Sequence, residues 1–137
     1  MAGYSATPLA AKLGIRTGTR LLAIGVPSNY PEFLDRLPEG VVLARRASKE
    51  VDIAHVFATR KSALGATLRT CRERLRHDAA VWVSWPKKAS KMSTDITEDT
   101  VRELALPLGF VDIKVCAITD VWSGLKLVVR KELRRQA

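Results

Sequence analysis

The sequence predicts an α/β protein: a three-layer sandwich whose central sheet is mostly parallel and ends in a C-terminal antiparallel hairpin. Three observations predict it. Short apolar runs of strand length, such as residues 20–26 and 51–57, alternate with segments that carry helix start and stop signals. Strands that alternate with helices pair in parallel through right-handed crossovers. The last two apolar runs, 110–118 and 125–131, are separated by one short stretch that suits a hairpin.

Caps, prolines and glycines set the bounds of the expected elements of this Rossmann-like sheet. The expected strands are residues 20–26, 40–44, 51–57, 81–85, 110–118 and 125–131. Four helices are expected. The first is short, opened by Thr7 and Pro8 and closed by Gly14, and the second runs from about Tyr30 to before Pro38. The third is capped by Thr59 and runs to about Leu75, and the fourth runs from about Glu98 to Leu106, with Asp95 or Thr97 as its cap.

The length and composition of the chain fit a single folded domain. With 137 residues, of which 47% are hydrophobic and 27% charged, the chain is long enough for one core and too short for two ordinary domains. We therefore expect one α/β domain over residues 1–137, with a frayed tail at 132–137. No signal-peptide pattern occurs, and no apolar run approaches the roughly 18 residues of a membrane span. A cytoplasmic protein is expected.

The charge balance favours anionic partners. The chain holds 23 Lys and Arg against 14 Asp and Glu, which gives a formal net charge of +9. Such an excess attracts nucleic acid, nucleotides or other anions, although it bears on association and not on fold. We expect an anionic small molecule or nucleic acid as the partner and no membrane association. The sequence leaves the oligomeric state open.

The loops that follow the strands are expected to form the ligand site. In parallel α/β sheets these loops gather at the carboxyl edge, where ligands bind. Here they carry basic and aromatic side chains near expected helix starts, where a bound phosphate is favoured. The residues predicted to bind a ligand are Tyr30, Arg45, Arg46, Trp85, Lys87, Lys88, Lys91 and Trp122. The alternative is that the long basic side chains extend into water.

The aromatic residues of this edge have two interpretations. Tyr30, Trp85 and Trp122 could stack a base between basic side chains, as nucleotide and single-strand binders do. They could equally be core residues that hold the hairpin on the sheet, and Trp82, on the fourth expected strand, is predicted to be core.

Few residues point to catalysis. His55 lies on an expected core strand, where a base could be tuned toward neutral pH, but a hydrogen-bonded core histidine is the favoured interpretation. Ser84 and Ser123 do not lie in a Gly-x-Ser-x-Gly elbow. Cys71 and Cys116 have no metal-ligand or disulfide spacing and are predicted to be buried reduced thiols. No metal site is expected, no cofactor is indicated, and the pattern favours a protein that is not an enzyme.

The order of the expected elements resembles class I methyltransferases. VDIAHVF (51–57) is similar to that family's fourth strand, LRHDAAVWVSW (75–85) to the loop and strand after its next helix, and LGFVDIKVCAIT with GLKLVVRK to its terminal hairpin. More specifically, WVSWPKKAS, TDIT, KVCAIT and WSGLKLV resemble a family of short bacterial proteins classed as a domain of unknown function. The resemblance implies a reduced methyltransferase-like fold and supplies no activity.

Two positions depart from the methyltransferase pattern. That family holds S-adenosylmethionine with a glycine-rich turn after the first strand and an acidic residue at the end of the second. Here the first turn, 25–30, lacks a glycine pair, and Arg45 and Arg46 follow the second strand. Arginine has the wrong charge for ribose hydroxyls and the right one for a phosphate.

The sequence therefore predicts a non-catalytic binding domain that takes an anionic ligand, a nucleotide or nucleic acid, at the carboxyl edge of the sheet. One alternative is a diverged small S-adenosylmethionine-dependent methyltransferase with His55 or Asp95 as its polar group. The other is a protein-interaction module whose basic face meets an acidic partner.

Overall fold

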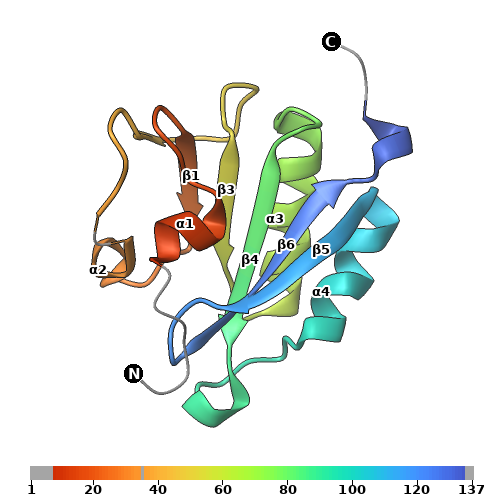
Figure 1. Ribbon diagram of the computed structural model, residues 1–137. Helices are drawn as coiled ribbons and strands as arrows, with labels where there is room; N and C mark the ends of the chain where they lie inside the picture. The colour runs from red at the N-terminus through yellow and green to blue at the C-terminus, as the bar shows by residue number, and fades with distance from the viewer. Residues whose placement is uncertain (1–7, 35, 135–137) are drawn as a thin grey trace.

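The computed structural model describes residues 8–34 and 36–134, which form one six-stranded sheet with helices on both faces (Figure 1). The strands are β1 (Arg20–Ile24), β2 (Val42–Ala44), β3 (Ile53–Phe57), β4 (Ala80–Pro86), β5 (Phe110–Ala117) and β6 (Trp122–Val129). The helices are α1 (Leu9–Leu13), α2 (Tyr30–Leu34), α3 (Lys61–Arg74) and α4 (Glu98–Ala105), with short 3-10 turns η1 (Lys88–Ser90), η2 (Leu106–Leu108) and η3 (Lys131–Leu133).

The strand order is β2-β1-β3-β4-β6-β5. β1 pairs in parallel with β2 and β3, and β3 pairs in parallel with β4. β6 is antiparallel to both β4 and β5, so the C-terminal hairpin inserts its last strand next to the parallel part of the sheet. The expected mostly parallel, Rossmann-like sheet with a terminal antiparallel hairpin is confirmed.

The side chains of β4 show how the sheet separates two layers of core. Val81, Val83 and Trp85 belong to the core cluster that α3 and α4 cover, whereas Trp82 belongs to the cluster under α1 and α2. Successive strand residues point to opposite faces, so a strand covered on both sides reads as a continuous apolar run. This is the reason that the run at 81–85 has no polar alternation. The layers make the predicted three-layer sandwich.

Several predicted ends are confirmed by their caps. Gly14 closes α1 with φ of +83°, and its N–H reaches the carbonyl oxygens of Ala10 and Ala11. Thr97 caps α4: its hydroxyl accepts from the N–H of Thr100 at 3.2 Å, and the Thr100 hydroxyl accepts from the N–H of Thr97. Pro8 is the N-cap of α1, and Thr7 lies outside the described residues.

Two strands differ from the prediction in ways that matter for the site. β2 has only three residues and ends at the level of Leu22, two residues before β1 ends. β6 begins at Trp122, which pairs with Pro86 of β4, so Trp122 lies in a strand and not in the hairpin turn. The turn is shorter because the Thr119 hydroxyl accepts from the N–H groups of Val121 and Trp122.

Both cysteines are free thiols. Cys71 is buried against the sheet, and burial raises its pKa to about 11. Cys116 is half-buried. As for membranes, none of the helices formed by residues 8–34 and 36–134 is long and apolar enough to span a bilayer.

Candidate functional site

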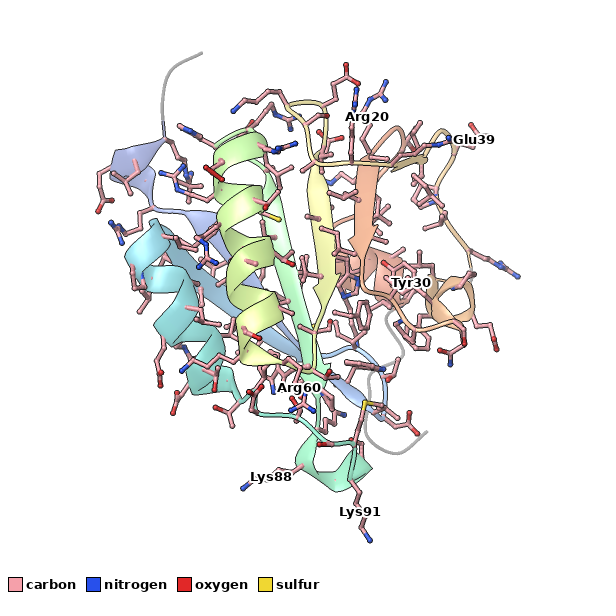
Figure 2. The ribbon with its side chains drawn as sticks, turned by 180° about the vertical axis from the view of Figure 1, so that it is seen from behind. Arg20, Tyr30, Glu39, Arg60, Lys88 and Lys91 are labelled. Atoms are coloured by element: carbon pink, nitrogen blue, oxygen red, sulfur yellow. The ribbon has the colours of Figure 1, made fainter. Side chains whose placement is uncertain are left out.

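A cavity of about 230 Å³ lies at the carboxyl edge, where β1 and β3 end and α3 begins. Its lining residues come from all three elements and from the start of β6: Gly25, Phe57, Ala58, Thr59, Arg60, Ala63, Thr67 and Trp122. Figure 2 shows Arg60 at this end of the molecule, above Lys88 and Lys91, with Arg20 at the opposite end. The cavity is where parallel α/β sheets bind ligands.

The wall of the cavity depends on one glycine. Gly25 has φ of +67°, and a Cβ on it would come within 2.6 Å of the carbonyl oxygen of Phe57. Only glycine allows the end of β1 to pass this close to the end of β3. Phe57 in turn packs edge-on against Trp122, with ring centroids 4.9 Å apart. The strand ends and one aromatic pair therefore form a fixed wall.

The start of α3 is capped from a distant loop. Asp95 Oδ1 accepts from the N–H of Lys61 at 2.6 Å, and the Thr94 hydroxyl donates to the carbonyl oxygen of Thr59 at 2.8 Å. The predicted cap by the Thr59 side chain is wrong, because Arg60 is the N-cap residue and a carboxylate from the loop before α4 supplies the acceptor. Asp95 thus places a negative charge at the positive end of the helix.

Replacing Asp95 with alanine should lower the free energy of unfolding by roughly 1–2 kcal/mol, because the N–H of Lys61 loses its acceptor and the loop loses its tie to α3. Chemical denaturation measures the loss. Asp120 is a matched control, since it is an exposed aspartate with no side-chain interaction among the described residues, and its change to alanine should cost less than about 0.5 kcal/mol. Equal losses in the two variants would contradict the capping role.

Arg60 is the one charged side chain on the cavity's described lining. It makes no ion pair or side-chain hydrogen bond with residues 8–34 and 36–134. Its neighbour Lys61 lies 3.8 Å from Glu103, a pair that is exposed and weak. An anion that entered the cavity would find the guanidinium of Arg60 unpaired.

The other predicted site residues are not brought together here. Trp122 lines the cavity, although it is buried in the same core cluster as Tyr30. Tyr30 and Trp85 are 5% and 6% exposed and do not line it. The expectation that these two rings face an open edge is wrong. Tyr30, the first residue of α2, packs against the sheet in one core cluster, and Trp85 packs in the other cluster, under α3 and α4. The core alternative describes their placement.

The predicted lysines lie beyond the cavity. Lys87 is half-buried, whereas Lys88 and Lys91 are exposed and point away from the domain at the tip of η1 (Figure 2). None of the three lines the cavity. Their placement fits solvated side chains, and a role in ligand binding stays a prediction.

Arg45 and Arg46 lie away from this edge. Because β2 stops at the level of Leu22, the chain turns back toward the start of β3 directly after the strand. The two arginines line a different cavity together with Arg20, the first residue of β1. Their predicted position beside the lysines at the carboxyl edge is wrong, because Ala44, the last residue of β2, pairs with Leu22, two residues before the end of β1.

His55 lies in a buried chain of hydrogen bonds. Its Nδ1 is 2.9 Å from the Tyr30 hydroxyl and its Nε2 is 2.8 Å from the Ser84 hydroxyl, and both His55 and Ser84 are fully buried. Burial lowers the pKa of His55 to about 3. The prediction of a hydrogen-bonded core histidine is confirmed. Its partners were not predictable, because only the parallel register of β3 and β4 brings Ser84 to it.

No group of three or more His, Cys, Asp or Glu side chains that could hold a metal ion occurs in the described part of the chain. The cavity lining offers hydroxyl groups from Thr59 and Thr67, the Arg60 guanidinium, backbone atoms and aromatic surface. These groups can bind an anion or a planar ring.

Comparison with solved structures identifies the fold. TrmN from Thermus thermophilus superposes with a TM-score of 0.56 at 13% identity over 88% of this chain, and this chain spans 47% of it. The Bacillus subtilis M1A22 tRNA methyltransferase TrmK superposes with a TM-score of 0.57 at 11% identity, and the match covers 92% of this chain and 67% of the TrmK chain. The chain has a methyltransferase-like Rossmann fold.

A third structure, the magnesium protoporphyrin IX methyltransferase ChlM from Synechocystis with bound S-adenosylmethionine, gives a TM-score of 0.56 at 11% identity over 88% of this chain and 74% of its own. Identities this low establish the fold alone. Neither the models of known protein families nor the curated proteins give a match. The resemblance to the short bacterial family thus stays a prediction.

Proposed function

We propose that this domain binds a nucleotide at its carboxyl edge, with the base in the cavity and the phosphate at Arg60. The observation that carries the proposal is the cavity at the end of β1 and β3 with an unpaired guanidinium on its lining. A phosphate would give the Arg60 guanidinium a counter-charge, because Asp95, which caps the N–H of Lys61, does not pair with it. The net charge of +9 favours an anionic ligand over a cationic one.

The size of the cavity limits the ligand. At about 230 Å³ it is smaller than the roughly 300–1,000 Å³ of ordinary small-molecule sites. One ring system fits, and the remainder of the ligand would lie along the rim. A mononucleotide therefore suits this cavity better than a dinucleotide.

The lining favours binding over catalysis. Among the described residues that form it, none is a carboxylate, imidazole or thiol. His55 lies beneath the surface, and its low pKa keeps it neutral and hydrogen-bonded to Tyr30 and Ser84. A general base must lie within hydrogen-bond distance of the proton that it removes, and His55 does not line the cavity.

S-adenosylmethionine is the second candidate, and the fold comparisons favour a methyltransferase over a non-catalytic binding domain. TrmK and ChlM, described above, are methyltransferases, and ChlM holds S-adenosylmethionine. Two features favour the nucleotide instead. The side of Gly25 that a Cβ would occupy is filled by the Phe57 carbonyl and offers no space to the cofactor. Arg60, on the cavity lining, favours a net-negative nucleotide over S-adenosylmethionine, which carries a cationic sulfonium.

Calorimetric titration of the wild-type protein with ATP and, separately, with S-adenosylmethionine tests the proposal. We expect ATP to bind more tightly, and Arg60→Ala to weaken ATP binding by roughly tenfold or more, because a charge-assisted hydrogen bond is lost. Arg69→Ala is the matched control, since Arg69 is an exposed arginine on α3 outside the cavity. It should change affinity by less than about twofold.

Tighter binding of S-adenosylmethionine than of ATP, unaffected by Arg60→Ala, would replace the proposal with the second candidate. Equal weakening of ATP binding by Arg60→Ala and Arg69→Ala would show that only net charge matters.

A further inference from the structure

A second cavity, of about 430 Å³, lies at the other end of the sheet and has a different chemistry. The residues that line it are Arg20, Ala44, Arg45, Arg46, Ser48, Lys49 and Glu50. Arg20 begins β1, and Figure 2 places it at the end of the molecule opposite Arg60. We call Arg20, Arg45, Arg46 and Lys49 the amino-edge cluster.

The short strand β2 creates this cluster. β2 ends after three residues, and the loop 45–50 must then return to the level at which β3 begins. Ser48 fixes the loop: its hydroxyl accepts from the N–H of Glu50 at 3.2 Å, and its carbonyl oxygen accepts from the N–H of Val51. The cations of the loop are thereby held beside Arg20, which the sheet positions.

The positive charge of the cluster is largely uncompensated. Glu50 is the one carboxylate among the described lining residues; it is 76% exposed and lies 3.7 Å from Arg20, a weak pair. Lys49 reaches only the carbonyl oxygen of Leu75, at 3.4 Å. The side chains of Arg45 and Arg46 make no ion pair or hydrogen bond within the part of the chain that the structure describes.

The carboxylate of Asp52 already has partners outside the cluster's side chains. Asp52, just before β3, accepts from the N–H of Arg20 at 2.8 Å and pairs with Arg76 at 2.8 Å. It is not part of the cavity lining. The cluster thus brings four cations around one cavity with a single, loosely held counter-charge, an arrangement in which an anion would relieve the mutual repulsion.

We propose that the amino-edge cluster binds a ligand that carries two or more neighbouring phosphate groups. A guanidinium can donate two parallel hydrogen bonds to a pair of phosphate oxygens. The guanidinium groups of Arg45 and Arg46 are available for this, because neither has a partner among the described residues. Ala44 is the one apolar side chain on the described lining, and no aromatic side chain is present to stack a base. Recognition therefore rests on the phosphates, whether they belong to a compact polyphosphate or to a nucleic-acid backbone. This site is independent of the carboxyl-edge cavity.

The test uses inorganic tripolyphosphate, titrated calorimetrically into the full-length protein at about 50 mM salt, where phosphate contacts are not screened out. We expect the double variant Arg45→Ala/Arg46→Ala to weaken binding by roughly tenfold or more. The control is Arg69→Ala/Arg74→Ala, which removes two exposed α3 arginines and lowers the net charge by the same amount. It should weaken binding by less than about threefold.

A second arm identifies the source of the phosphates. A short single-stranded oligothymidine is added as a competitor of tripolyphosphate. If it displaces tripolyphosphate, and if its own binding is weakened equally by Arg45→Ala/Arg46→Ala, the ligand is a nucleic-acid backbone. Failure of the oligonucleotide to compete supports a compact polyphosphate. No tripolyphosphate binding by the wild type, or equal weakening by the two double variants, would overturn the proposal.

Discussion

Replacing Gly25 with alanine should lower the free energy of unfolding by roughly 2–4 kcal/mol. Two costs add at this position. The residue has φ of +67°, which disfavours any side chain, and the new Cβ would come within 2.6 Å of the Phe57 carbonyl oxygen, a backbone atom of a central strand. The end of β1 or of β3 must shift, and the cavity wall shifts with it. Urea denaturation measures the stability loss, and nucleotide titration should show weakened binding.

Gly14 provides the comparison. It also has a left-handed backbone, with φ of +83°, but nothing lies within 4 Å of a Cβ placed there. Gly14→Ala should therefore lower the free energy of unfolding by about 1 kcal/mol, the cost of a side chain on a left-handed backbone alone. Equal losses at Gly14 and Gly25 would mean that the close approach of the Phe57 carbonyl contributes nothing, and the wall would then not depend on that glycine.

Acid should destabilise the protein earlier than its carboxylates alone would do. His55 has a pKa of about 3 in the folded state against 6.5 ordinarily. Well above pH 6.5 the histidine is neutral in both the folded and the unfolded state, and its burial has no pH dependence. As pH falls from 6.5 toward 3, the unfolded chain takes up a proton that folded His55 does not, so stability decreases.

The measurement is the free energy of unfolding between pH 6.5 and 5, a window above most carboxylate titrations. Wild type should lose roughly 1.5–2 kcal/mol from this one residue. His55→Gln should remove that part of the pH dependence, even if the substitution also lowers the free energy of unfolding at pH 7. A wild-type slope in His55→Gln would refute the assignment.

The fold could be predicted because local signals agreed with it. The apolar run at β4 ended at a proline, and Thr97 with first-turn acids marked the start of α4. Parallel pairing followed from the alternation of strands and helices. The antiparallel hairpin followed from the short gap between the last two strands.

The site was less accessible to sequence reasoning because its geometry depends on register and on distant contacts. Arg45 and Arg46 were placed at the carboxyl edge because they follow the second strand, but the register of β2 against β1 ends that strand at the level of Leu22 and puts them elsewhere. The cap of α3 comes from Asp95, a distant contact that no local cap rule covers. Arg60 was not among the residues predicted to bind a ligand, because its cavity depends on the meeting of Gly25 with Phe57.

The most direct test of the carboxyl-edge site is amide chemical-shift mapping of the isotope-labelled protein during titration with ATP. The account predicts that the largest changes fall on the cavity residues: Gly25, the stretch 57–60, Ala63, Thr67 and Trp122. Changes confined to the loop 45–50 would mean that the phosphates alone are bound, at the amino-edge cluster. That result, or no change at all, would contradict nucleotide binding at the carboxyl edge.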